Sequence, residues 1–346
     1  MPRTPHWFDA IAVLAAVAAG PSGSVISPKT VTLNKPDATL SDVLGELRSQ
    51  TGLHVAAPGL SEGPGPVQFD RTPFWTAVEQ LAAKTGTRIA LGKQGREITL
   101  VKRSGPMPPS SVDGPFRVAV RQVQVRTDFE SGKTFSEVTL DVHWEPRFPV
   151  FRIDSEPAIT AVADDRGSRI TPATAKARTS PGGFLYTTTV RIEGVPRSAT
   201  KLTRLAGTFT VTSSERMLPF AFDLGGKTPV TLPAQEGVSA TLRRFEKVDD
   251  RWEAELEMTY PPGQPEFESF ESWVTENRAR LVGPDKAKSL DPTDYDIPEQ
   301  GRRVVAVYRF AGSALTNPKG WTLTYETPAP LVEFPVRFEL KDIPLP

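Results

Sequence analysis

The sequence of 346 residues contains no cysteine. This absence excludes disulfides, thiolate zinc sites, iron–sulfur clusters, a cysteine nucleophile and lipidation of an N-terminal cysteine. Only three histidines occur, His6, His54 and His143. The 41 lysines and arginines balance the 41 aspartates and glutamates, so the chain lacks the positive excess typical of proteins that bind nucleic-acid backbones. We therefore expect no nucleic-acid partner.

The motifs of several enzyme classes are also missing. No G-x-G-x-x-G follows an expected strand and no G-x-x-x-x-G-K occurs, so there is no phosphate-binding loop to name. The serine pairs that begin at Ser110 and Ser213 lack a G-x-S-x-G context and a neighbouring histidine. A Ser–His–Asp triad would need His54 or His143 to approach from another domain. The sequence predicts a non-enzymatic protein, with no catalytic residue, metal ligand or cofactor assigned.

Long apolar runs are absent after the N-terminus, so we expect a protein that does not span the membrane. Residues 1–19 read MPRTPHWFDAIAVLAAVAA, with a basic Arg3 and an unbroken apolar run from Ala10 to Ala19. This run is about half the roughly 20 residues that a membrane-spanning helix needs. The small residues around Ala18 fit a signal-peptidase site, which predicts export to the periplasm or cell envelope. A buried N-terminal helix is the alternative.

Residues 28–103 repeat one strand–helix–strand plan. In the first half, Leu40 to Leu47 carries a helical apolar stripe, Thr39 and Asp42 resemble a capping box, and Gly52 is placed to end the helix. In the second half Thr72 is the expected N-cap, Pro73 the first helical residue and Gly86 the stop. The expected strands are 31–33, 53–55, 67–69, 88–91 and 98–101. These elements predict a small βαβ–βαβ domain with a final strand.

This stretch resembles the short N-terminal domain of secretins and TonB-dependent receptors. The shared pattern is V-T-L, A-T-L-S-D-V-L-G-E-L and T-G-L-H-V, followed by V-Q-F, T-P-F-W-T-A-V-E-Q-L-A-A-K-T-G-T-R-I and I-T-L-V. The resemblance implies an interaction module or signalling dock in the bacterial envelope. Reuse of a common fold as a structural spacer is the alternative. The rest of the chain resembles neither a secretin pore nor a receptor barrel.

The composition and the pattern of apolar residues change after residue 103. Residues 104–115 are rich in proline and serine and predict a stiff linker. Beyond them, short alternating runs are separated by Pro, Gly, Asp and Asn clusters, which is typical of antiparallel strands. A short helix is also expected within residues 267–281.

The strand pattern recurs after about 116–120 residues. The sharpest match is between 218–224, LPFAFDL, and 334–340, FPVRFEL. Each repeat is long enough for a β-sandwich of immunoglobulin-like size. We therefore expect an α+β multidomain protein that is mainly β. The small βαβ–βαβ domain would be followed by two tandem antiparallel sandwiches, 116–225 and 226–346, that arose by internal duplication.

Two polar clusters and a set of tryptophans are candidate binding residues. Asp141 and His143, with Glu145, share a strand face and could hold a metal or act as an acid–base pair, or simply form an exposed polar face. Asp291, Asp294 and Asp296 offer oxygen ligands for calcium or form a solvated loop. Tryptophans could stack on sugars or fill the cores; those considered are Trp144, Trp252, Trp273 and Trp321.

These features favour an exported adaptor that docks to an envelope protein through an exposed sheet edge or helix face of residues 28–103. The alternative is a carbohydrate- or cell-wall-binding protein. It would use the sandwich aromatics or the loop from Asp291 to Asp296 to bind cell-wall glycan.

Overall fold

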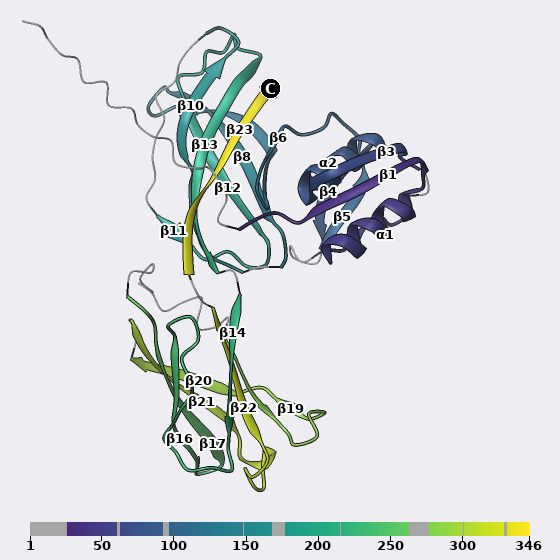
Figure 1. Ribbon diagram of the computed structural model, residues 1–346. Helices are drawn as coiled ribbons and strands as arrows, with labels where there is room; N and C mark the ends of the chain where they lie inside the picture. The colour runs from purple at the N-terminus through teal and green to yellow at the C-terminus, as the bar shows by residue number, and fades with distance from the viewer. Residues whose placement is uncertain are drawn as a thin grey trace, which may run out of the picture.

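The computed structural model describes residues 26–60, 63–92, 97–147, 149–167, 177–214, 216–262, 277–299, 301–328 and 331–346. Strands dominate these residues and helices are short, which confirms the mainly-β multidomain class. Three bodies are visible in Figure 1: a small α/β body and two strand-rich bodies. The expected export signal lies outside the described residues. None of the helices in those residues has the length and apolar character that crossing a membrane requires.

The first body, here the N-terminal unit (residues 26–103), follows the predicted order of elements. It contains β1 (Thr30–Ala38), α1 (Leu40–Thr51), β2 (Val55–Ala56), β3 (Gly65–Pro73), α2 (Phe74–Lys84), β4 (Thr87–Gly92) and β5 (Glu97–Lys102). Strands β1 and β3 pair antiparallel, and a separate sheet has the order β2–β5–β4. Each helix turns one apolar face to the core, and in α1 the buried face comprises Leu40, Val43 and Leu47, whereas Leu44 of the predicted stripe is half-buried.

The helix ends show where local sequence determines structure. Thr39 and Asp42 form the predicted capping box, and Gly52 ends α1 in the left-handed conformation with φ 74°. The prediction for the second helix is wrong by one residue, because Pro73 and not Thr72 is the N-cap. Thr72 belongs to β3, where it lies opposite Val31 in the ladder. Strand pairing therefore overrides the capping preference of the threonine.

Sandwich 1 lies beside the N-terminal unit. Its strands are β6 (Ser110–Asp113), β7 (Phe116–Thr127), β8 (Thr134–Trp144), β9 (Val150–Asp154), β10 (Ala158–Asp164), β11 (Arg178–Thr179), β12 (Leu185–Glu193) and β13 (Lys201–Ser214), with one more strand described below. One sheet has the order β12–β8–β7–β6, and the other contains β10, β13, β9 and β11. The predicted linker 104–115 is thus too long, because Ser110–Asp113 pairs with β7 and is part of the sandwich.

Sandwich 2 has two sheets, β14–β22–β18–β19 and β15–β16–β17–β21–β20. Its elements are β14 (Met217–Asp223), β15 (Val230–Thr231), β16 (Ser239–Val248), β17 (Arg251–Thr259), β18 (Arg278–Val282), β19 (Ser289–Leu290), β20 (Asp294–Glu299), β21 (Arg303–Ala311), the 3-10 turn η1 (Gly312–Ala314) and β22 (Thr322–Pro328). Of the helix expected within 267–281, the part up to 276 lies outside the described residues. Residues 278–281 belong to a strand.

The domain boundary predicted at residues 225 and 226 is wrong, because the two sandwiches exchange a strand. Strand β14 follows sandwich 1 in the sequence but pairs with β22 of sandwich 2. The final strand, β23 (Leu331–Pro344), follows sandwich 2 but pairs along its whole length with β13 of sandwich 1. In Figure 1 the yellow C-terminal strand accordingly runs beside β13, far from β22. The chain crosses between the sandwiches at 214–217 and again at 328–331.

The two crossings keep one register. Ser214 lies opposite Leu331 on one side, and Met217 lies opposite Pro328 on the other. Two residues therefore separate the paired positions on each strand. Residues 201–214 with 331–344, in sandwich 1, and residues 217–223 with 322–328, in sandwich 2, are thus antiparallel pairs that keep one common register.

Turn chemistry explains why neither strand folds back as a hairpin. The two residues after β13 are Glu215 and Arg216, and the two after β22 are Ala329 and Pro330. A two-residue hairpin turn needs positive φ, for which Gly, Asn and Asp are preferred. Neither pair contains these residues, and the proline ring fixes φ near −65°. The sequence therefore opposes a hairpin at both places and favours continuation into the other sandwich.

A buried interface and an open groove as candidate functional sites

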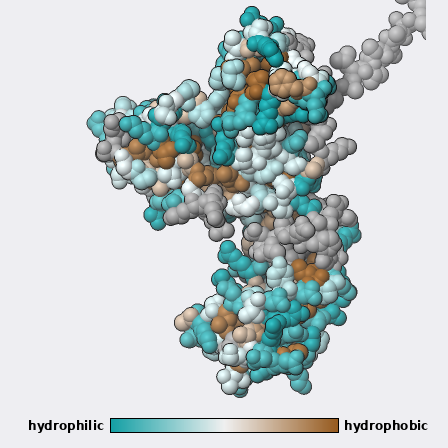
Figure 2. Space-filling model, turned by 180° about the vertical axis from the view of Figure 1, so that it is seen from behind, coloured by the Kyte–Doolittle hydropathy of each residue, from teal (hydrophilic) through white to brown (hydrophobic). Residues whose placement is uncertain are grey.

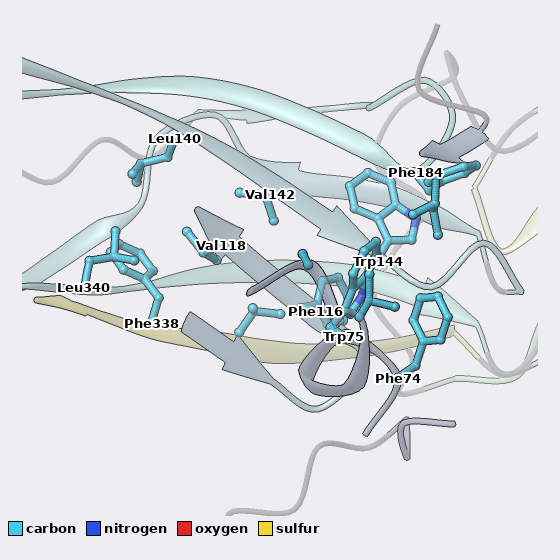
Figure 3. Packing of buried hydrophobic residues seen from close by; sticks show 14 of the residues in the cluster. Phe74, Trp75, Phe116, Val118, Leu140, Val142, Trp144, Phe184, Phe338 and Leu340 are labelled. Carbon is cyan, nitrogen blue, oxygen red and sulfur yellow. The ribbon is translucent and has the colours of Figure 1, made fainter. Parts of the chain in front are cut away.

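The N-terminal unit and sandwich 1 share one continuous hydrophobic core. Phe74 and Trp75 of α2 lie beside Phe116 and Trp144 of sandwich 1, and Phe338 of the exchanged β23 lies further along the same core (Figure 3). The Trp75 indole Nε1 donates a hydrogen bond of 3.0 Å to the carbonyl oxygen of Pro115. The two bodies are therefore joined by packing that buries large aromatic rings.

A polar cluster lies within this junction. The Arg117 guanidinium is almost fully buried, and its Nε lies 2.7 Å from Oε1 of Glu79 on α2. The Ser110 hydroxyl donates to the same carboxylate. Arg117 also lies 3.3 Å from Nδ1 of His143, whose ring packs against Trp75 at a centroid distance of 5.7 Å. Burial, with a contribution from the Arg117 charge, lowers the pKa of His143 to about 3. This histidine is therefore neutral at physiological pH.

A second buried carboxylate fixes the start of the N-terminal unit. Glu145 is fully buried, accepts a hydrogen bond of 2.9 Å from the backbone nitrogen of Lys29, and pairs with Arg147 at 2.5 Å. The Arg147 guanidinium also donates to the carbonyl oxygen of Ser27. Burial raises the pKa of Glu145, and the hydrogen bonds oppose that shift. Glu145 and Arg147 thus tie residues 27–29 to the end of β8.

The structure corrects the prediction of an exposed polar face at residues 141–145. His143 and Glu145 are buried at the junction, and Asp141 is half-buried, accepting a hydrogen bond from Thr187 and pairing with Arg121. The three side chains do not converge, and no metal-binding group of three acidic or histidine residues exists among the described residues. Sequence reasoning missed the burial of His143 because α2, which covers it, lies about sixty residues earlier in the chain.

Two of the three aspartates proposed as calcium ligands have arginine partners. Asp291 pairs with Arg280 at 2.7 Å, and Asp294 pairs with Arg309 at 3.1 Å. Asp294 and Asp296 lie in β20 and not in a loop. Cationic partners and a strand backbone are unsuited to the six to eight converging oxygens that calcium prefers.

The other candidate residues that the structure describes are packed in the sandwiches or hydrogen-bonded to neighbouring segments. Trp144 and Trp252 are buried in the cores, Trp321 is half-buried beneath Lys288, and Trp273 lies outside the described residues. The serine pairs have hydrogen-bond partners: besides the bond from Ser110 to Glu79, Ser111 Oγ accepts from Glu339 N, and Ser213 Oγ donates to the carbonyl oxygen of Pro149. None of these serines is hydrogen-bonded to His54 or His143.

An open groove lies on the N-terminal unit, between α1 and the edge of the three-stranded sheet. Its volume is about 760 Å³, and α1, β2, the turn after β2 and the start of β5 line it. Apolar side chains supply much of the lining, among them Leu44 and Leu60, which are only half-buried. Figure 2 shows that hydrophobic residues on the face drawn there gather in small patches, one of them on the N-terminal unit.

Strand β2, which lines part of the groove, is an edge strand. Strand β2 is the terminal strand of the order β2–β5–β4, so one of its edges has no strand partner among the described residues. An edge strand presents unpaired backbone N–H and C=O groups that can pair with another chain. The opposite wall is open above Gly45, where an added Cβ would meet nothing within 4 Å.

The groove also carries charge. Arg48 of α1 and Glu97 of β5 both line it, and so does His54, which is exposed. Sequence reasoning recognised the helix and the strand but missed the groove. The available signal was Gly45, because a glycine in the middle of a helix costs about 1 kcal/mol relative to alanine and needs another reason to be there.

Comparison with models of protein families, with characterised proteins and with solved structures finds no match to this chain. The resemblance of residues 28–103 to the secretin and TonB short N-terminal domain therefore stays a prediction.

Proposed function

We propose that this protein is an exported, non-enzymatic adaptor of the cell envelope, and that the groove of the N-terminal unit docks an extended segment of a protein partner. The segment would add to β2 through backbone hydrogen bonds and place alternate side chains against the α1 wall. Apolar residues of the segment would contact Leu44 and Leu60, and Arg48 would receive an acidic residue at the rim.

The open edge of β2 beside an apolar wall is the observation that carries this proposal. Strand addition combines main-chain hydrogen bonds, which supply affinity, with side-chain pockets, which supply specificity. Both parts are present in the groove. The rest of the chain would then hold the docking unit at a defined place, because the N-terminal unit shares its core with sandwich 1.

The glycan-binding alternative has less support. The tryptophans described in the sandwiches are buried or half-buried, and Asp291 and Asp294 are paired with arginines. A sugar would therefore find no exposed row of these rings among the described residues on which to stack.

The test is a substitution that fills the groove without disturbing the core. Gly45→Arg places a long side chain over the open wall, and the helix gains by losing its glycine. The matched control is Gln80→Arg, which adds the same charge to an exposed position of α2. Removing residues 28–103 altogether is a poorer test, because it would expose the core face of sandwich 1.

Crosslinking and affinity capture from the native envelope would compare the two variants with the unaltered chain. We expect one protein to be captured by the unaltered chain and by Gln80→Arg, and to be lost with Gly45→Arg. The same proteins recovered with all three chains, or cell-wall glycan alone, would contradict the proposal.

A further inference from the structure

Sandwich 1 contains a strand-binding site that the chain fills with its own C-terminus. The site is formed by the full length of β13 on one side and by β6 on the other. Alternate side chains of β23 are buried in the core of sandwich 1: Phe334, Val336, Phe338, Leu340 and, after a change of phase, Ile343. Gly207 makes room for one of them, since a Cβ there would lie 2.8 Å from the Phe338 ring.

The outer edge of β23 is held by side chains and not by another strand. The backbone nitrogen of Arg337 donates to Asp113 at 2.8 Å, and that of Glu339 donates to Ser111 at 3.2 Å. Pro335 has no N–H to satisfy. The site therefore recognises an extended segment with apolar residues at every second position and a proline near its start.

The sequence contains this pattern twice, in β14 and β23. Leu218, Phe220 and Phe222 of β14 fill sandwich 2 as Phe334, Val336 and Phe338 fill sandwich 1. Pro219 and Pro335 occupy the same place in the two strands. The carbonyl oxygen of Pro219 is also bound by a side chain, Gln235 Nε2, at 2.7 Å. Each sandwich is thus completed by a strand donated from the other repeat.

We propose that the strand-binding site of sandwich 1 also accepts β23 from a second copy of this chain, so that two copies form a symmetric dimer by exchanging their C-terminal strands. Such a dimer reuses the β13–β23 contacts of the single chain. Strand β23 pairs with β13 and with no other described strand, whereas β14 follows directly on β13 and pairs with β22. Sandwich 2 stays complete throughout, because β14 remains paired with β22.

The sequence before β23 disfavours the alternative in which a released β23 folds back on β22. A released β23 could fold back on β22 only through a hairpin at Ala329 and Pro330, which lack the residues such a turn requires. The edge of β22 next to that hairpin is already taken by β14. A released strand therefore has two sites to choose between, its own sandwich 1 and that of another copy. Concentration decides between them, because the first event is intramolecular and the second is not.

The absence of cysteine makes a direct test possible. Thr208 lies opposite Arg337, and both side chains point outward from the core. The Arg337 N–H points away from β13, to Asp113, so this is a non-hydrogen-bonded pair, in which Cα atoms are about 4.5 Å apart and a disulfide fits. One preparation of the full chain carries Thr208→Cys and a second carries Arg337→Cys. A disulfide between the two preparations requires that β23 of one copy lies in sandwich 1 of the other.

The two preparations are mixed, unfolded and refolded together at low and at high concentration, oxidised, and separated without reductant. We expect a mixed dimer whose share rises roughly in proportion to protein concentration while it is the minor species. The matched control replaces Arg337→Cys by Lys341→Cys, an exposed position of the same strand displaced by about 13 Å, which is too far to bridge. The double variant T208C/R337C confirms that the pair closes within one chain.

A mixed dimer no more abundant than in the Lys341→Cys control, together with ready closure of the double variant, would overturn the proposal. Mixed dimer in clear excess over the control, with the mass of two folded chains in size-exclusion chromatography, would support it.

Discussion

The N-terminal unit and sandwich 2 are both attached to sandwich 1, but by different means. The N-terminal unit packs against sandwich 1 through aromatic rings and a buried ionic cluster, and the two bodies have one hydrophobic core. Sandwich 2 has a core of its own, to which sandwich 1 contributes Phe151 and Leu331. Its attachment is the pair of strands that cross between the repeats.

The difference shows that two domains can be coupled either by a common hydrophobic core or by an exchange of strands. At the first junction, stability depends on which side chains lie across the interface, so substitutions on either side act on both bodies. At the second junction, each sandwich depends on a strand encoded in the other repeat. A substitution in the last twenty residues therefore acts on a sandwich that begins about 220 residues earlier.

The largest expected effect comes from a substitution that lies in the second repeat of the sequence but in the core of sandwich 1. Phe338→Ala removes a buried ring that packs against Phe209 at 5.7 Å, and should cost about 3–5 kcal/mol of unfolding free energy. Hydrogen exchange should show the loss of protection in β7, β8 and β13 of sandwich 1, and not in β16, β17 and β21 of sandwich 2.

The counterpart is Phe222→Ala in β14, which is equally buried but lies in the core of sandwich 2. Its loss of protection should fall on sandwich 2. If each substitution weakened the sandwich of its own repeat, the strand exchange would be wrong.

The next effect tests the packed junction. Glu79→Ala leaves the buried Arg117 guanidinium without its carboxylate and should cost about 2–3 kcal/mol, measured by denaturant unfolding. The control is Glu339→Ala, whose partner Arg204 is exposed, and which should cost about 0–1 kcal/mol. Equal costs for the two substitutions would mean that the junction cluster is not buried in solution.

Acid should weaken the same junction. The unfolded chain protonates His143 near pH 6.5, but the folded chain resists protonation until about pH 3, so stability falls as the pH drops through that interval. Glu145 acts in the opposite direction, because a raised pKa lets the folded chain hold a proton that the unfolded chain releases.

Comparing the unaltered chain with the His143→Gln variant isolates the contribution of the histidine to the pH dependence of stability, since both chains contain Glu145. Between pH 6.5 and 5 the unaltered chain should lose about 1–2 kcal/mol more than His143→Gln, at roughly 1.4 kcal/mol per pH unit. Parallel pH profiles for the two chains would show that His143 titrates normally and is not buried.

The smallest expected effect tests whether a local change in α1 also destabilises sandwich 1 through the common hydrophobic core. Thr39→Ala removes the capping hydrogen bond at the start of α1 and should cost about 1 kcal/mol. Because the N-terminal unit and sandwich 1 share a core, thermal unfolding should shift for both bodies and not for sandwich 2. Ser49→Ala, at an exposed position of the same helix, is the control and should change little. A shift confined to the N-terminal unit would show that it unfolds independently.

The elements were predictable wherever the signal was local. The Thr39 capping box, the Gly52 stop and the alternation in 138–144 each depend on residues within one turn or one strand of each other. The burial of His143 was not predictable in this way, because its neighbours Glu79 and Trp75 come from another body. The groove was not predictable for the same reason, since α1 and β5, which both line it, are separated by about fifty residues of sequence.

The sequence by itself determined the mainly-β class of fold, the order of elements in the N-terminal unit, and the matching strand patterns at 218–224 and 334–340. These follow from periodicity and turn chemistry, which act over a few residues. Only the tertiary structure decided which sandwich each matching strand completes, because the two strands carry the same apolar alternation and the sequence does not say which sheet edge each one meets. It also decided that His143 and Glu145 are buried and that β2 is an open edge, since burial and pairing depend on what the rest of the chain places alongside.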